Sequence, residues 1–154
     1  MRPAFLTLAL LLAACDGLFV DCSDYGEFTA AVRGALTLDL HGHAISLDRT
    51  DRAAFDLSLQ RRGVNYAGHI GFDVEGARRA IGTFRVEDGL TVRYDIDSRT
   101  EQVFRARSGS LSIEAIDADD VTGSFSFEAI DGNGAVVAVA GRFRADARSY
   151  PHLN

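Results

Sequence analysis

The chain contains no lysine and little proline or cysteine: all sixteen basic side chains are arginine, and its 154 residues include two prolines and two cysteines. Two cysteines exclude a disulfide-rich scaffold. A chain of this length needs no such cross-links, because it buries roughly two-thirds of its unfolded surface on folding. Fifteen glycines beside so few prolines do not fit a disordered chain. We expect one ordered domain with many turns.

Net positive charge is also lacking. The formal net charge is -6 at pH 7, and this excludes a general nucleic-acid binding surface, which would be basic. We interpret the arginine-only content as the codon bias of a GC-rich genome, although arginine also suits two-pronged contacts with anions.

The first fourteen residues have the pattern of an export signal. Arg2 is followed by an apolar run at 4–14 (AFLTLALLLAA), which is too short to span a bilayer comfortably. The tetrapeptide LAAC at 12–15 resembles the lipobox of bacterial lipoproteins, in which the signal is cut before the cysteine and that cysteine receives lipid. We therefore expect a lipoprotein signal peptide at 1–14 and a membrane anchor through lipid on Cys15.

The expected location is the bacterial cell envelope, at the outer membrane or the periplasmic face of the inner membrane. Asp16 resembles an inner-membrane retention signal of some enteric bacteria, a rule that varies among lineages. With lipid on Cys15, Cys22 is the only free thiol of the mature chain, and its acidic neighbours Asp21 and Asp24 argue against an activated nucleophile. The alternative is an ordinary signal peptide, which would allow a disulfide between Cys15 and Cys22.

Downstream, apolar and polar residues alternate with the two-residue period of half-buried strands. The alternation is clearest at 121–129, and it resumes at 137–145 after the turn residues DGNG at 131–134. Shorter stretches with this rhythm, including one on each side of a bend expected at Gly42, lie at 28–40, 44–47, 55–59, 66–72, 81–86, 90–97, 102–108 and 109–116.

This rhythm predicts an all-β fold: an antiparallel β-sandwich or up-and-down β-barrel of about 8 to 10 strands. Ile45 and Leu47 are expected to face the core, and 73–80 is expected to be a long connection because Gly76 weakens a helix there. The expected organisation is a signal peptide at 1–14, a tether at 15–26, an antiparallel β domain at 27–147 and a flexible tail at 148–154.

Three stretches near the C-terminus carry a family resemblance: GSLSI at 109–113, VTGSFSF at 121–127 and GRF at 141–143. They resemble the C-terminal pattern of DUF6252, a family of bacterial envelope lipoproteins of unknown function, which reads as a glycine-led strand, an acidic turn, a V-x-G-x-F-x-F strand and a closing G-x-F. The resemblance covers the upstream strands only by rhythm. It implies an exported β-domain and carries no catalytic residue to transfer.

Two groups of side chains are of the types that can act as metal ligands. His41 and His43 would share one face of a continuous strand with Asp39, a spacing compatible with two metal ligands, whereas nothing in the sequence brings His69 or His152 near them. We expect exposed turn histidines and no metal.

The second group is acidic and lies in two turns, Asp117, Asp119 and Asp120 in one and Asp131 with Asn133 in the next. Their oxygens suit Ca²⁺, but the turns flank one strand and would lie about 30 Å apart at ~3.3 Å per residue. We expect the ordinary chemistry of hairpin turns.

Catalytic motifs are also lacking: the chain has no G-x-S-x-G elbow, no phosphate-binding loop and no H-E-x-x-H. We expect a binding or structural module that meets another envelope protein, without cofactor or catalysis. The alternative is a carrier of a small apolar ligand inside a β-barrel. An enzyme would require Asp39, His41 and another polar group to converge. The arginines on strand faces are expected to form cross-strand ion pairs with aspartate and glutamate.

Overall fold

The computed structural model describes residues 26–49, 51–61, 68–96 and 102–150, without the side chains of the last two. Among these residues, no helix is long and apolar enough to cross a membrane. A single 3₁₀ turn spans Val86–Asp88. The strands are β1 (Gly26–Gly34), β2 (Leu38–Arg49), β3 (Ala54–Arg61), β4 (His69–Glu75), β5 (Gly82–Arg85), β6 (Leu90–Asp95), β7 (Val103–Ile116), β8 (Asp120–Ile130) and β9 (Val136–Tyr150).

The strands form a closed eight-stranded antiparallel barrel with one extra strand, which confirms the predicted fold class. Around the barrel the order is β1, β2, β3, β4, β6, β7, β8 and β9, and β9 pairs again with β1. The extra strand, β5, lies in the connection between β4 and β6 and pairs with β7. Neighbours in space are therefore neighbours along the chain, apart from β5 and from the pairs that β9 forms with β1 and β2.

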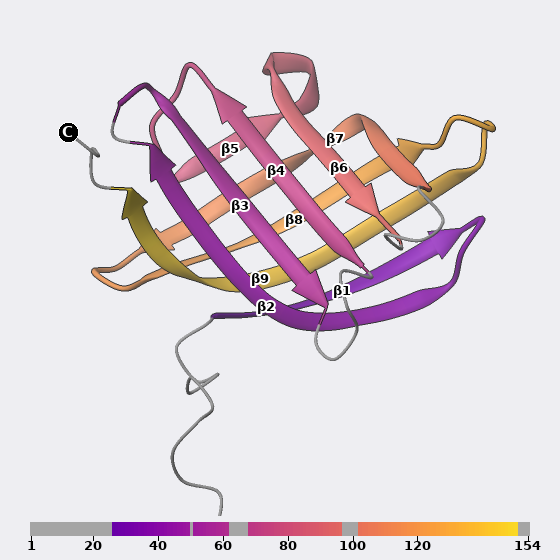
Figure 1. Cartoon of the computed structure of the whole chain (residues 1–154), viewed down its shortest axis with the longest axis horizontal. Helices are drawn as coiled ribbons and strands as arrows, with labels where there is room; N and C mark the ends of the chain where they lie inside the picture. The colour runs from indigo at the N-terminus through magenta and orange to yellow at the C-terminus, as the bar shows by residue number, and fades with distance from the viewer. Residues whose placement is uncertain (1–25, 50, 62–67, 97–101, 151–154) are drawn as a thin grey trace, which may run out of the picture.

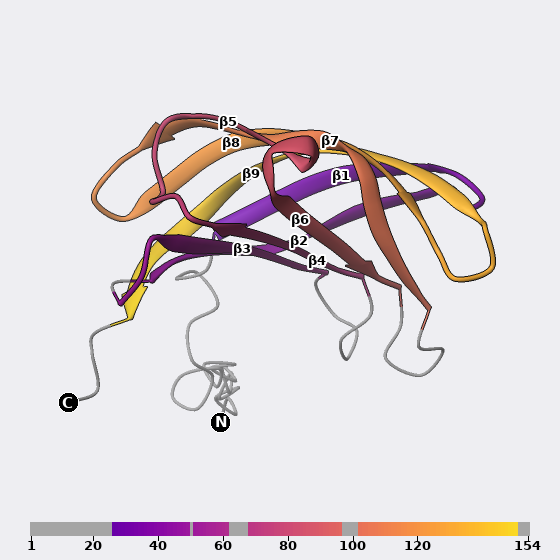
Figure 2. The ribbon, with the colours of Figure 1, turned by 90° about the horizontal axis from the view of Figure 1, so that it is seen from above.

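The barrel is flattened into two layers that cross steeply. Strands β2, β3, β4 and β6 form one layer, and β1, β5, β7, β8 and β9 form the other (Figures 1 and 2). Beyond the start of β1, the end of β9 pairs directly with β2 in a short parallel ladder. We call the end of the barrel where β3 stops the Arg61 end, and the opposite end, where β8 begins, the Asp120 end.

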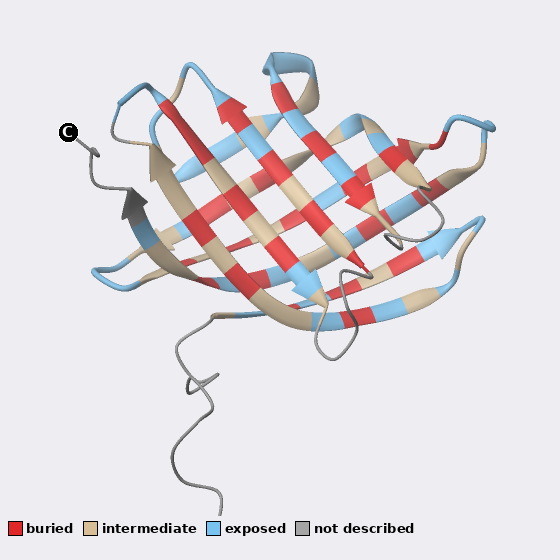
Figure 3. Ribbon diagram, viewed as in Figure 1, coloured by how far each residue is buried: buried red, intermediate tan, exposed pale blue. Residues whose placement is uncertain are grey.

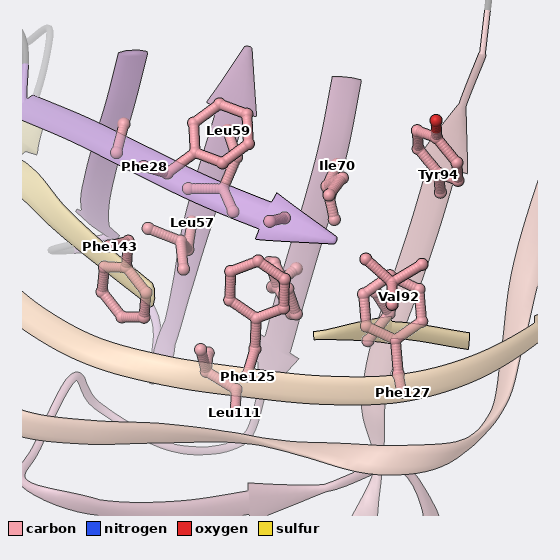
Figure 4. Packing of buried hydrophobic residues seen from close by; sticks show 14 of the residues in the cluster. Phe28, Leu57, Leu59, Ile70, Val92, Tyr94, Leu111, Phe125, Phe127 and Phe143 are labelled. Atoms are coloured by element: carbon pink, nitrogen blue, oxygen red, sulfur yellow. The ribbon is translucent and has the colours of Figure 1, made fainter. Parts of the chain in front are cut away.

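The core is one cluster of apolar side chains inside the barrel, supplied by alternate residues of the strands (Figure 3). Across the lumen, the Phe72 ring of β4 meets the rings of Phe125 and Phe127 of β8, with centroids 5.2 and 5.9 Å apart. Figure 4 shows the rings of Phe125 and Phe127 among other buried side chains. Each fully buried ring contributes about 2 to 3 kcal/mol of hydrophobic free energy, so this row ties the two layers together.

The two G-x-F stretches of β8 and β9 fit one another across the hairpin. Gly123 lies opposite Phe143, and Phe125 lies opposite Gly141. A Cβ built on Gly123 would come within 2.8 Å of Phe143 Cζ, and one on Gly141 within 2.6 Å of Phe125 Cζ. Each ring therefore fills the space that the glycine opposite leaves. Both phenylalanines are buried, as the alternation at 121–129 and 137–145 predicts.

The prediction for the first strands was wrong in detail. The stretch 28–40 contains a turn between β1 and β2, and β2 then runs through Gly42 without a bend. Gly42 is paired on both sides, with β1 and with β3, so the alternation set by Leu40 continues unbroken. Ala44 and Ser46 are therefore buried, while Ile45 and Leu47, expected in the core, are half-buried on the outer face.

Other boundaries also differ from the predicted ones. The stretches 102–108 and 109–116 form one strand, β7, because bulges shift its register against β8 without breaking the pairing. Strand β4 extends to Glu75, and 76–81 then connects it to β5 without a helix, as expected for a long connection. Strand β9 runs to Tyr150, beyond the domain boundary that we placed at 147.

Candidate functional site

Several of the predicted site residues lie outside the described part of the chain: Cys15, Cys22 and His152. Asp39 is exposed, and its carboxylate accepts a hydrogen bond from Arg33 at 2.8 Å, so it is held in a surface ion pair. His41 lies two residues further along the same strand face. Among the described residues, no group of three or more histidines, cysteines, aspartates or glutamates is placed to hold a metal ion.

The acidic turns lie at opposite ends of β8, and carboxylates in both are held by neighbouring donors. Asp120 accepts two hydrogen bonds from Arg144, at 2.7 and 2.9 Å. Asp131 accepts one from the Gln102 side chain at 3.0 Å and two from backbone N–H groups of its own turn. The Gln102 contact is the main reason why the pKa of Asp131 is lowered, with the backbone donors adding to it.

A chain of three polar side chains crosses the outer face of β3, β4 and β6. The Ser58 Oγ lies 2.9 Å from Nε2 of His69, and Nδ1 of the same ring lies 3.6 Å from Oδ2 of Asp95. The first distance is a hydrogen bond, while the second is an electrostatic contact slightly too long for one. Serine, imidazole and carboxylate in this order form the arrangement that activates a serine hydroxyl.

The register of the sheet builds this Ser58–His69–Asp95 chain. His69 is directly opposite Asp95 on β6, and Ser58 is opposite Gly71 on β4. Because Gly71 has no side chain, the imidazole leans over it and reaches Ser58. A Cβ on Gly71 would lie 3.3 Å from Cε1 of the ring.

Arg93 fixes the carboxylate at the end of the chain. Its Nε and Nη2 lie 2.9 and 2.8 Å from Oδ1 of Asp95, which leaves Oδ2 facing His69. The alternation at 66–72 predicts that His69 faces outward from the buried Ile70 and Phe72, as it does, but it gives no sign of the Ser58–His69–Asp95 chain. Alternation shows which face a side chain occupies, whereas the partner across the sheet depends on register.

A second polar group lies inside the barrel, near the Arg61 end. The side chain of Tyr94 is 1% exposed, its ring stacks on Phe104, and its hydroxyl has no hydrogen-bond partner among the described residues. Figure 4 shows the hydroxyl oxygen on the side of the ring away from Val92 and Phe127. Burial raises the pKa of Tyr94, and the charge of Arg61 partly opposes that rise.

Arg61 is the cation whose charge acts on this hydroxyl. It lies opposite the inward-facing Gly42 and is half-buried. Its aliphatic stem packs over Gly68, where a Cβ would lie 3.1 Å from the Arg61 Cβ. Within the described ranges, its guanidinium forms no ion pair or side-chain hydrogen bond. The Arg61 end therefore holds two donors, Arg61 and Tyr94, and no described acceptor for either.

Two carboxylates face each other on the outer surface near the Asp120 end. Asp56 and Asp73 are directly opposite across β3 and β4, and Arg49 pairs with Asp56 at 2.6 Å. The pKa of Asp73 is raised, first by its partial burial and then by its hydrogen bond to Asp56 and the repulsion from it. The hydrogen bond to Asp56 is also the main reason why the pKa of Arg49 is raised.

Comparisons with protein-family models, with curated proteins and with solved structures find no match to this chain. The resemblance to DUF6252 therefore stays a prediction.

Proposed function

We propose that the chain is a lipid-anchored β-barrel of the cell envelope that binds an amphiphile with an acidic head group and an apolar body at the Arg61 end. One observation carries the ligand class: the buried hydroxyl of Tyr94 has no described partner, and the charge of Arg61, at the same end of the barrel, acts on it. The sequence suggested, as an alternative, a carrier of a small apolar ligand, and the ligand proposed here has an acidic head group in addition to an apolar body.

Both groups need an acceptor. A buried hydroxyl without a partner costs about 1 to 3 kcal/mol, and a partly buried cation without a counter-charge adds to that cost. A carboxylate would satisfy both, because its two oxygens accept from an arginine and a tyrosine at once. Two donors without a partner among the described residues, next to apolar inward positions, therefore favour an anion.

The neighbours of Tyr94 select the rest of the ligand. Toward the middle of the barrel, the inward positions beside and beyond it are apolar: Leu59, Ile70, Val92 and Phe104 are all at least 98% buried. These side chains belong to the apolar cluster of the lumen, and the alkyl chain of the proposed ligand would pack among them while the head group stays near the rim. The proposed ligand class is thus a long-chain carboxylic acid.

The binding test compares dodecanoate with dodecanol by titration calorimetry on the purified chain, since the two differ only in the head group. Arg61→Gln is expected to weaken dodecanoate binding about 10- to 100-fold and to leave dodecanol binding unchanged, because a hydrogen bond to a charged group contributes about 1.5 to 3 kcal/mol. Arg105→Gln removes an exposed arginine of β7 and serves as the matched control. Equal affinities of the wild type and Arg61→Gln for dodecanoate would refute the proposed site.

The lipid anchor is tested separately. Cys15→Ser removes the proposed acceptor of lipid and is expected to move the protein from the membrane to the soluble periplasmic fraction. An unchanged membrane fraction would remove the anchor from the proposal without affecting the ligand site.

A further inference from the structure

We propose that Ser58, His69 and Asp95 form a second site, on the outer face of the barrel, that hydrolyses small esters through an acyl-serine intermediate. The site is built from other residues than the lumen site, and it does not depend on the proposed ligand. It also goes against the sequence-based expectation that the chain is not an enzyme.

The geometry meets the first requirement of a nucleophile and its base. The distance of 2.9 Å between Ser58 Oγ and His69 Nε2 falls within the range of about 2.6 to 3.2 Å that proton transfer needs. The three residues lie on three neighbouring strands, so the backbone ladder fixes their spacing (Figure 1). Strands position side chains more rigidly than loops do.

The order of the three side chains suits proton transfer from Ser58 to His69. With a proton on Nδ1 facing Asp95, Nε2 of His69 is free to accept the proton of Ser58. Asp95, with Oδ2 at 3.6 Å from Nδ1, is a positioning residue whose negative charge favours this tautomer and the imidazolium that forms. Arg93 holds the other oxygen of Asp95 through two N–H groups, so the carboxylate keeps its orientation.

Ser58 is half-buried on the outer face, beside two partly exposed side chains. The side chains of His69 and Asp95 are 37% and 21% exposed, so small molecules can reach the Ser58–His69–Asp95 chain. Ser58 is paired across the sheet with Ile45 of β2 on one side and with Gly71 of β4 on the other, and Gly71 is paired in turn with Arg93 of β6. The half-buried Ile45 offers an apolar contact for a short acyl group.

The proposed reaction proceeds in two steps. Ser58 Oγ attacks the acyl carbon as its proton passes to His69 Nε2. The ester C–O bond breaks, and the departing alcohol oxygen takes the proton from Nε2. Water then attacks the acyl-serine and gives a proton to Nε2, the bond between Oγ and the acyl carbon breaks, and Oγ recovers the proton. The products are one alcohol and one carboxylic acid.

The test uses the purified full chain and two probes. A fluorophosphonate reports an activated serine, because its P–F bond breaks as a bond forms from phosphorus to Oγ, and mass spectrometry locates the adduct. Hydrolysis of p-nitrophenyl acetate reports turnover. Ser58→Ala is expected to abolish both signals, and Ser126→Ala, which removes an exposed serine on β8, is the matched control that keeps both.

Two further variants separate chemistry from structure. His69→Ala is expected to lower the hydrolysis rate about 100-fold, in line with the loss of a general base, and added imidazole is expected to restore part of it. Asp95→Asn is expected to lower the rate and change its pH profile, because the orientation of the imidazole is lost. Far-UV circular dichroism checks that each variant is folded.

Each result of these tests either supports the proposed ester-hydrolysing site or overturns it. An adduct on Ser58 with hydrolysis that follows the variants in this order supports the site. Wild-type signals no higher than those of folded Ser58→Ala would overturn it, as would an adduct on another residue. Neither result bears on the binding of dodecanoate, because the lumen residues are unchanged.

Discussion

Tyr94→Phe is expected to stabilise the protein while weakening its proposed binding of an acid. The substitution removes only the hydroxyl oxygen from a side chain that is 1% exposed, and that oxygen has no described hydrogen-bond partner. The stacking of the ring on Phe104 is kept. The cost of the orphaned hydroxyl is therefore relieved without loss of packing.

The expected gain is about 1 to 2 kcal/mol in the free energy of unfolding, the lower part of the range for an unsatisfied buried polar group. For a domain of this size, each kcal/mol shifts Tm by about 2 to 4 °C. The measurement is urea unfolding followed by far-UV circular dichroism at pH 7, with thermal unfolding alongside. Equal m-values would show that the denatured state is unchanged.

The pH dependence gives the same prediction a second test. The pKa of Tyr94 is raised in the folded protein, chiefly by burial. Below about pH 10 both states keep the proton, and above it the unfolded chain ionises first, so the wild type loses stability as the pH rises toward the folded-state pKa. The advantage of Tyr94→Phe should therefore widen above about pH 10.

Tyr94→Leu is the control for the ring. It also removes the hydroxyl, but it deletes the stacked ring and leaves a cavity, so it should destabilise the protein by about 2 kcal/mol or more. A wild type as stable as Tyr94→Phe, or more stable, would refute the claim that this hydroxyl is unsatisfied in the free protein.

Three further predictions concern the strands and turns. Gly141→Ala should cost about 1 to 3 kcal/mol in urea unfolding, because its Cβ would meet the Phe125 ring, whereas Gly132→Ala, with open space around it, should cost less. Asp73→Asn should stabilise the protein by about 0.5 kcal/mol at pH 7, an advantage that shrinks as the pH falls through the raised pKa of Asp73 toward about 4, since the folded protein binds the proton more tightly than the unfolded chain. Asp131→Asn should lower Tm at pH 7, and the difference should vanish in acid, because a lowered pKa supplies stability that is lost as the carboxylate is protonated.

The fold class was predictable because the two-residue period is a local property. In 121–129 every second residue faces inward, and these inward residues carry the apolar side chains. The same alternation is found whichever strands pair with this one, so it can be read from the sequence alone. Strand limits were harder. Gly42 and Gly109 both suggested breaks, yet Gly42 sits inside the ladder and Gly109, with φ of 127°, is absorbed within β7. Pairing on both edges of a strand overrides the local preference of a glycine.

The candidate sites depend on contacts that no local pattern carries. Alternation alone puts Ser58, His69 and Asp95 outside and Tyr94 inside. That His69 meets Asp95, and that Arg61 shares the lumen with Tyr94, follows from the register of three strands joined by long connections. The pair that the sequence did single out, His41 with Asp39, shares a face as its spacing implies, but Asp39 pairs with Arg33.

The central claim is that the Arg61 end of the barrel binds the acidic head of an amphiphile. A crystal structure of the chain grown with dodecanoate tests it most directly. The account predicts that the carboxylate lies within hydrogen-bond distance of both the Tyr94 hydroxyl and the Arg61 guanidinium, with the alkyl chain against the apolar lumen. Dodecanoate bound elsewhere, or a crystal without it at saturating concentration, would contradict the account.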